Sequence, residues 1–168
     1  YTAATQGIRV TIERGTDFTG DGNIDDKYFD VENVRASNFD DYIFGYDGYD
    51  STFYGMDGDD IFRGSDANET VYGGEGNDDL RGDGGDDTLH GEDGDDFFEG
   101  GNGNDVLIGG LGDDFMRGGS DNDVLEGGDG NDRLYGDEGA DTLRGGDGSD
   151  LLNGGEGSDT LYGDGGDD

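Results

Sequence analysis

The sequence contains no cysteine, and its positively charged side chains are scarce: 9 Lys and Arg face 45 Asp and Glu, for a formal net charge of −36. The lack of cysteine excludes disulfides and thiolate-bound zinc or iron–sulfur centres. No basic stripe is present that could release counterions from nucleic acid, and the acidic surface repels anionic membranes. The sequence shows neither a signal peptide nor an apolar run of the roughly 18 residues that a transmembrane helix needs. We therefore expect no nucleic-acid partner and no membrane insertion, and any secretion would be directed by sequence outside this chain.

Hydrophobic residues are also few, at 28% of 168 residues. Low hydrophobicity combined with high net charge is typical of disordered chains, because too little apolar surface can be buried to offset the lost chain entropy. The chain is long enough to form one domain. It can fold only if something neutralises its carboxylates. Calcium is the natural candidate, since it binds carboxylate and carbonyl oxygens.

The abundant residue is glycine, with 39 copies, and its copies recur with a period of nine. Ten successive nine-residue rows begin at Gly73, and in each of them position six is Asp and position eight is apolar. Further rows begin at Ala36, Gly45, Gly55 and Gly64, and the row from Gly45 has ten residues. With Asp50 taken as position six of that row, fifteen successive position-six residues are acidic. Such self-similarity is the signature of a repeat architecture.

Each row divides into a turn of six residues and a strand of three. Glycine at positions one, two and four permits backbone angles closed to other residues, and the strand then alternates outward, inward and outward. One inward side chain per row cannot stabilise an isolated unit, so the rows must stack as a solenoid. Stacked turns bring the position-six carboxylates about 4.8 Å apart, where like charges repel unless a cation lies between them.

These rows resemble the RTX (repeats-in-toxin) motif GGxGxDxUx, from about Ala36 to Asp168. The resemblance implies an all-β fold, a right-handed parallel β-roll in which two rows make one coil and residues 18 apart share a sheet. One sheet would carry Phe62, Leu80, Phe98, Met116, Leu134 and Leu152 inward, and the other Val71, Leu89, Leu107, Leu125, Leu143 and Leu161.

The same resemblance places calcium between stacked turns, held by position-six carboxylates and by turn carbonyls near positions two and four. The candidate carboxylates are Asp60, Asp78, Asp87, Asp96, Asp105, Asp114, Asp123, Asp132, Asp141, Asp150 and Asp159. The candidate carbonyl donors are those of Gly74, Gly76, Gly101, Gly103, Gly110, Gly112, Gly128 and Gly130. The row from Gly64 departs most from the motif, with Ser65, Ala67 and Glu69 in place of Gly, Gly and Asp, and is the weakest candidate.

Residues 1–35 do not follow the period, and we interpret them as an N-terminal strand and capping segment ahead of the roll at 36–168. Within them Asp17, Asp21 and Asp25 occupy positions one, five and nine of a sequence that opens like an EF-hand loop. Tyr28 stands at position twelve, where an EF-hand has a bidentate Glu. An Asp- and Gly-rich turn between strands is therefore favoured over a calcium site there.

No feature of this segment predicts catalysis. His90, the only histidine, falls at outward position nine and has no evident partner, and neither HExxH nor G-x-S-x-G occurs. Glycosidase chemistry needs one carboxylic acid with a raised pKa in a cleft, whereas these carboxylates recur identically. We expect no enzymatic activity from this segment.

Two aromatic side chains at an outward position suggest a possible contact surface. Phe97 and Phe115 both stand at position seven and lie one coil apart, so ordinary cross-strand stacking is favoured. The alternative is a surface for self-association, or for contact with a cell surface or polysaccharide, through these rings or through calcium.

The leading hypothesis is a calcium-binding structural module that folds outside the cell, in a secreted or bacterial cell-surface protein. The resemblance implies type I secretion and suggests an adhesin, an S-layer or matrix protein, or a toxin. The alternative is the carboxy-terminal module of a secreted protease, lipase or polysaccharide epimerase. A disordered calcium buffer is disfavoured, because a buffer needs neither the period nor the position-eight hydrophobes. Because the first strand follows Tyr1 closely and the last row stops at Asp168, we expect a longer parent protein.

Overall fold

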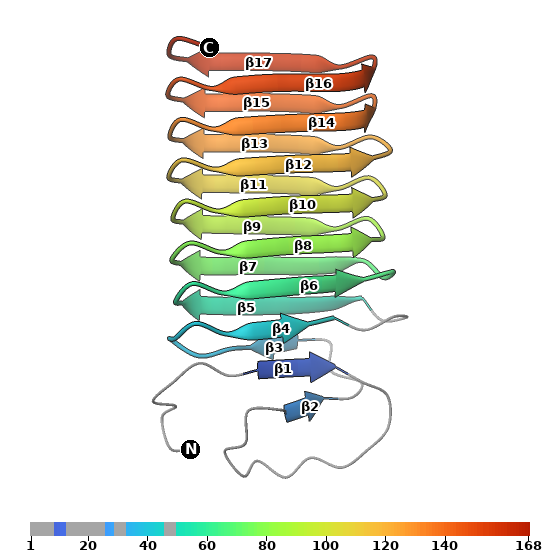
Figure 1. Ribbon diagram of the computed structural model, residues 1–168, viewed down its shortest axis with the longest axis vertical. Coiled ribbons are helices and arrows are strands. Elements are labelled where there is room, and N and C mark those ends of the chain that lie inside the picture. Colours follow the sequence, from blue (N-terminus) through green and yellow to red (C-terminus); the bar gives the residue numbers. More distant parts are fainter. Residues whose placement is uncertain (1–8, 13–25, 29–32, 46–49) are drawn as a thin grey trace.

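The computed structural model describes residues 9–12, 26–28, 33–45 and 50–168. This part of the chain contains β-strands and no helix, so it has no helix able to cross a membrane. The chain winds as a parallel β-roll that passes from one sheet to the other at every turn, and strands of the two sheets run in opposite directions (Figure 1). The all-β roll predicted from the repeat is confirmed.

The larger sheet has nine strands in the order β16-β14-β12-β10-β8-β6-β4-β1-β2. Their bounds are β16 Leu151–Gly157, β14 Arg133–Gly139, β12 Phe115–Ser120, β10 Phe97–Asn102, β8 Asp79–Gly84, β6 Ile61–Ser65, β4 Tyr42–Phe44, β1 Arg9–Ile12 and β2 Asp26–Tyr28. The eight-stranded sheet has the order β17-β15-β13-β11-β9-β7-β5-β3. Its strands are β17 Thr160–Gly165, β15 Thr142–Asp147, β13 Val124–Asp129, β11 Val106–Leu111, β9 Thr88–Asp93, β7 Glu69–Glu75, β5 Ser51–Asp57 and β3 Asn33–Arg35.

The register of neighbouring strands confirms two rows per coil. Leu107 pairs with Leu125, 18 residues later, and Phe98 pairs with Met116 in the other sheet. The strands are longer than the three residues predicted, because positions two and three of the following row also enter the parallel ladder. Only positions four to six are left to link the sheets.

The position-eight side chains of both sheets form one narrow core. From Ile43 to Leu143 they are buried, and eight of them, including Leu107 and Met116, have no measurable exposure. The inward assignment of the two sheets is confirmed. Leu152 is only partly buried and Leu161 is 45% exposed, because no later coil covers them in the described chain.

The structure corrects the frame of the ten-residue row. Ser51, not Asp50, pairs with Glu69, and Asp50 instead accepts a hydrogen bond from the backbone N–H of Asn68 at 3.2 Å. The extra residue of the row therefore precedes Asp50 in the sequence, and β5 is in register with β7. Position six of this row is Ser51, so the uninterrupted series of acidic position-six residues begins later than predicted.

At the N-terminal end, β1 pairs with both β4 and β2, and β3 pairs with β5. The strand β3 belongs to the eight-stranded sheet although it precedes residue 36. The division into a capping segment and a roll remains a prediction. The EF-hand-like residues Asp17, Asp21 and Asp25 lie outside the described residues.

Candidate cation sites between stacked turns

The turns of alternate rows lie on opposite edges of the roll, so the position-six residues form two columns. The first edge carries Asp41, Asp60, Asp78, Asp96, Asp114, Asp132, Asp150 and Asp168. The second edge carries Ser51 and then the acidic residues Glu69, Asp87, Asp105, Asp123, Asp141 and Asp159. All of these except Asp159 and Asp168, which lie in the last coil, are buried. Buried carboxylates are rare unless they are paired or bind a metal.

In the columns from Asp60 and Asp87 onward, one oxygen of each carboxylate ties successive coils together. Asp78 donates its backbone N–H to Oδ1 of Asp96 at 2.7 Å, and Asp105 donates in the same way to Oδ1 of Asp123 at 2.8 Å. The pattern repeats along both edges, so Oδ1 of each later Asp accepts a hydrogen bond from the preceding coil. The backbone of the preceding coil thus fixes the orientation of these side chains.

The second oxygen of these carboxylates is buried and has no hydrogen-bond donor. The ten Oδ2 atoms in this state belong to Asp60, Asp78, Asp87, Asp96, Asp105, Asp114, Asp123, Asp132, Asp141 and Asp150. An unpaired buried polar atom costs about 1–3 kcal/mol, and more when it is charged. Each of the ten belongs to a turn that has another turn stacked after it on the same edge.

Glycine at position one makes room for this second oxygen. A Cβ on Gly73 would overlap Oδ2 of Asp78 in the same turn and would lie 2.9 Å from the carbonyl oxygen of Gly91 in the next coil. The unpaired carboxylate oxygen and a backbone carbonyl oxygen of the next turn therefore face the same small space. Every row from Gly45 onward keeps glycine at position one.

Positions two and four turn their carbonyl oxygens toward the next coil. The backbone there is left-handed, with φ of 119° at Gly128 and 152° at Gly130, and a Cβ at either residue would overlap the carbonyl oxygen of Gly110 or Gly112 one coil earlier. Among the eight predicted donors, the carbonyls of Gly76, Gly101, Gly110, Gly112, Gly128 and Gly130 face a later glycine in this way. Gly74 and Gly103 share their backbone geometry.

The donor set between two turns fits a hard cation. It combines the unpaired Oδ2 of one turn, carbonyl oxygens of positions two and four that face the next coil, and a position-one carbonyl oxygen of the next turn. Oδ1 of the next turn also lies between the turns, where it accepts a backbone N–H. Within the described residues no three His, Cys, Asp or Glu side chains form a metal-binding group, so side chains alone would not suffice and carbonyls must complete the shell. Calcium takes about six to eight oxygen ligands in flexible geometry and suits this mixture.

The pKa values of the position-six carboxylates also favour a cation between the turns. Burial raises the pKa of Asp78, Asp87 and Asp114 to about 8, and neighbouring carboxylates add to the effect, while the backbone hydrogen bond to each opposes it. The pKa is raised to about 7 for Asp60 and Asp123, and to about 6 for Asp96, Asp105 and Asp132. Without a counter-cation these carboxylates are therefore difficult to keep charged at neutral pH.

A second ladder runs along each edge at position five, and we did not predict it from the sequence. Oδ1 of Asp113 accepts the backbone N–H of Asn131 at 2.7 Å, and Oδ1 of Asn104 accepts that of Asn122 at 3.3 Å. The donors here come from the following coil, opposite to the position-six ladder. The frequent Asp and Asn at position five is the signal that could have indicated it.

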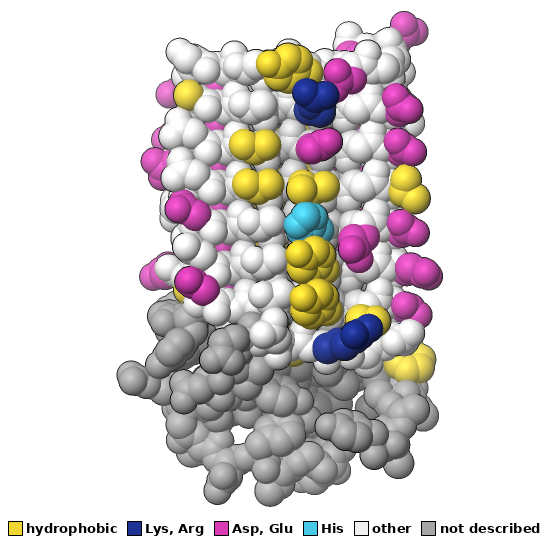
Figure 2. All heavy atoms as spheres, turned by 180° about the vertical axis from the view of Figure 1, so that it is seen from behind, with side chains coloured by type: hydrophobic (Ala, Val, Ile, Leu, Met, Phe, Trp, Pro, Cys, Tyr) yellow, Lys and Arg dark blue, Asp and Glu magenta, His cyan; other side chains and the backbone are white. Residues whose placement is uncertain are grey.

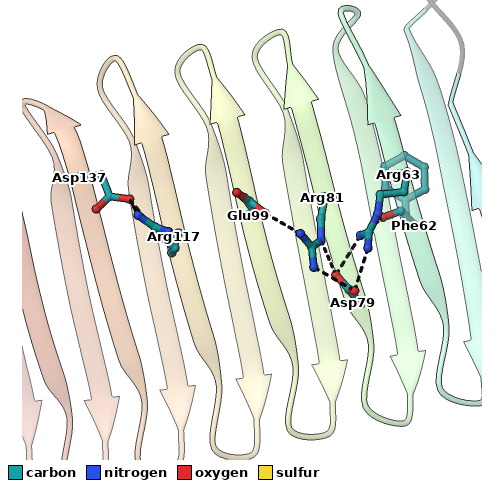
Figure 3. Close-up of polar contacts among 7 residues, drawn as sticks. All are labelled: Phe62, Arg63, Asp79, Arg81, Glu99, Arg117 and Asp137. Carbon is teal, nitrogen blue, oxygen red and sulfur yellow. Dashed lines mark hydrogen bonds and ion pairs between the residues drawn. The ribbon is translucent and has the colours of Figure 1, made fainter.

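Arginines bridge coils on the outer face of the nine-stranded sheet (Figure 3). Asp79 accepts hydrogen bonds from Arg63 at 3.0 Å and from Arg81 at 2.8 Å, and Arg81 also contacts Glu99 at 2.9 Å. Although burial alone would raise the pKa of Asp79, these two arginines lower it. The network neutralises part of the acidic surface without any cation.

Aromatic rings stack along both outer faces. On the eight-stranded sheet the rings of Tyr54, Tyr72 and His90 follow one another with centroids 5.1 and 4.7 Å apart. Figure 2 shows the histidine (cyan) in a vertical column of side chains, with hydrophobic ones (yellow) directly below it. His90 is half-buried against Tyr72, and burial lowers its pKa. Phe97 and Phe115 stack at 5.3 Å, as predicted for cross-strand packing. Self-association or polysaccharide contact through them is not supported.

The fold and these sites define a class of protein, the parallel β-rolls whose stacked turns present carboxylate and carbonyl oxygens to a cation. The family model for the RTX calcium-binding nonapeptide repeat matches residues 35–66, 47–80, 72–107, 81–116, 108–143 and 135–168. The chain belongs to this family, so it is a calcium-binding repeat module. Among curated individual proteins none matches the chain.

Proposed function

We propose that this chain is a structural module whose folding is driven by calcium. The observation that carries the proposal is the set of ten buried Oδ2 atoms without a hydrogen-bond donor, eight of which share a small space with a backbone carbonyl oxygen of the next coil. A site that spans two coils does not exist in the unfolded chain, so the free energy of calcium binding adds to that of folding. Calcium supplies the positive charge that the carboxylates need there, while the chain's own residues orient the ligands.

The place of action that fits this linkage is outside the cell. Extracellular calcium modules bind with dissociation constants of about 10⁻⁴ to 10⁻³ M, so such a module is folded outside and unfolded in the cytosol. Membership of a family typical of secreted proteins supports the same location. We place the module in a secreted or cell-surface protein, such as an adhesin, a matrix protein or a toxin, and assign it no catalysis of its own.

The experiment that tests the proposal is a calcium titration followed by far-ultraviolet circular dichroism, with chelator reversal. We expect a cooperative and reversible gain of β signal with calcium. Magnesium is the matched control, because it demands near-octahedral geometry and releases its water reluctantly. A spectrum that is already β-rich in chelator at pH 8, or an equal response to magnesium, would contradict calcium-driven folding.

A further inference from the structure

The acidic column on each edge begins with a turn that has serine at position two. On the first edge Ser37 donates its backbone N–H to Oδ2 of Asp41 at 2.7 Å and its hydroxyl to the same carboxylate at 3.0 Å. On the second edge Ser65 donates its hydroxyl to Oε1 of Glu69 at 2.8 Å and its N–H to Oε2 at 3.2 Å. Two turns of different sequence thus share one arrangement.

In these two turns both carboxylate oxygens are used inside the turn. Neither Asp41 nor Glu69 has a buried oxygen without a donor, although both are buried. The unpaired Oδ2 atoms begin one coil later, at Asp60 on the first edge and Asp87 on the second. The feature that marks a cation site in this roll is therefore missing from the turns 36–41 and 64–69.

The backbone of the serine turns also differs. Each of the other turns from residue 55 onward has a positive φ at both position two and position four, including non-glycine residues such as Asp83 (68°) and Glu92 (78°). Ser65 and Ala67 do not have a positive φ, and neither do Ser37 and Phe39. The hydroxyl of Ser65 also accepts the N–H of Ala67 at 3.1 Å, which closes the turn around the side chain.

We propose that the turns 36–41 and 64–69 bind no calcium, because serine donors take the place that the ion has in the turns with an unpaired Oδ2 atom. This inference rests on the proposed function. It assigns one calcium ion to each of the ten unpaired Oδ2 atoms. In the two serine turns, hydrogen bonds from Ser37 and Ser65 hold the carboxylate instead. The calcium-bound coils then stack on the two serine turns, which need no ion.

The test is to rebuild the repeat motif in the second serine turn. The triple variant Ser65→Gly, Ala67→Gly, Glu69→Asp converts this row into GGDGND and frees a carboxylate oxygen opposite the carbonyl of Gly82. Native mass spectrometry of the full chain at saturating calcium should count one more ion than in the unsubstituted protein. The control Ala67→Gly keeps Ser65 and Glu69 and should leave the count unchanged.

A second variant decides the matter if the triple variant does not fold. Ser65→Ala removes the hydroxyl that pairs with Glu69, and we expect a lower thermal midpoint at saturating calcium with the same number of bound ions. Loss of one ion in Ser65→Ala, or an unchanged count in a folded triple variant, would overturn the inference. Absence of calcium from the unsubstituted protein would instead overturn the proposed function.

Discussion

Adjacent acidic residues in one turn have different environments although their charges are equal. Asp114 at position six is buried, and its Oδ2 has no donor. Asp113 at position five is exposed, and its Oδ1 accepts N–H and side-chain donors from Asn131. The stacking of the coils determines this difference, since each ladder receives its donors from the opposite neighbour.

The two side chains therefore offer a matched pair of substitutions. Asp114→Asn and Asp113→Asn remove the same charge from neighbouring positions, but only the first removes a predicted ligand. We expect Asp114→Asn to raise the calcium midpoint for folding and to cost about 1.5–3 kcal/mol at saturating calcium, the value of a hydrogen bond to a charged group. Asp113→Asn keeps its acceptor oxygen and should change little. Equal effects in a calcium titration would sink the ligand assignment.

Protons compete with calcium at these carboxylates. In chelator, the raised pKa values mean that the folded protein holds protons that the unfolded chain has already released. The stabilisation by these bound protons is complete below about pH 4, the pKa of Asp in the unfolded chain, and is lost as the pH rises through about 8. The stability of the calcium-free protein should therefore increase on acidification. Circular dichroism in chelator between pH 8 and pH 5 measures it, and a flat profile would contradict it. The calcium midpoint should fall as the pH rises over the same range.

Each strand contributes a single inward side chain, so the core tolerates little change. Leu107 of β11 has no exposed surface, whereas the next residue, Ile108, faces outward. We expect Leu107→Asp to prevent folding even at saturating calcium, because it places a charge in a core only one side chain deep. Ile108→Asp introduces the same charge on the outer face and should retain the calcium-induced transition. A normal calcium-induced transition in Leu107→Asp would show that the assignment of position eight to the core is wrong.

The position-five ladder links successive turns on one edge without a cation. Asn122 accepts the N–H of Ala140 at 3.0 Å and donates its side-chain amide to Asn104 at 3.1 Å. We expect Asn122→Ala to lower the free energy of unfolding by about 0.5–1.5 kcal/mol, as for an ordinary hydrogen bond. Urea unfolding at saturating calcium measures the loss, and the number of bound ions should stay the same. Asn122→Asp keeps the acceptor and serves as the control.

The predictable parts of this fold are those fixed by periodicity. Position eight defined the core, and the spacing of 18 residues defined the sheets, because both follow from the geometry of a stacked coil. The direction of the position-five ladder could not be predicted, since it depends on which neighbouring coil supplies the donors. The true position six of the ten-residue row, Ser51, was missed because the sequence does not show where in a turn an extra residue lies.

At the scale of the whole molecule, the net charge of −36 opposes folding in two ways. Exposed carboxylates repel one another through solvent, and salt screens this repulsion, with a Debye length of about 3 Å at 1 M. The ten buried carboxylate oxygens lie between coils, where bulk ions cannot screen them without entering the site. Only the buried carboxylates need a cation with a defined coordination shell.

Monovalent salt should therefore not replace calcium. In chelator with 1 M sodium chloride we expect no gain of β signal, although the outer repulsion is almost fully screened, because the buried carboxylates still lack a ligand. Millimolar calcium in the same salt should fold the chain, with a midpoint close to that at low ionic strength. Circular dichroism over a matrix of salt and calcium concentrations separates the two effects. Folding by sodium chloride alone would mean that general screening, rather than ions between the turns, stabilises the roll.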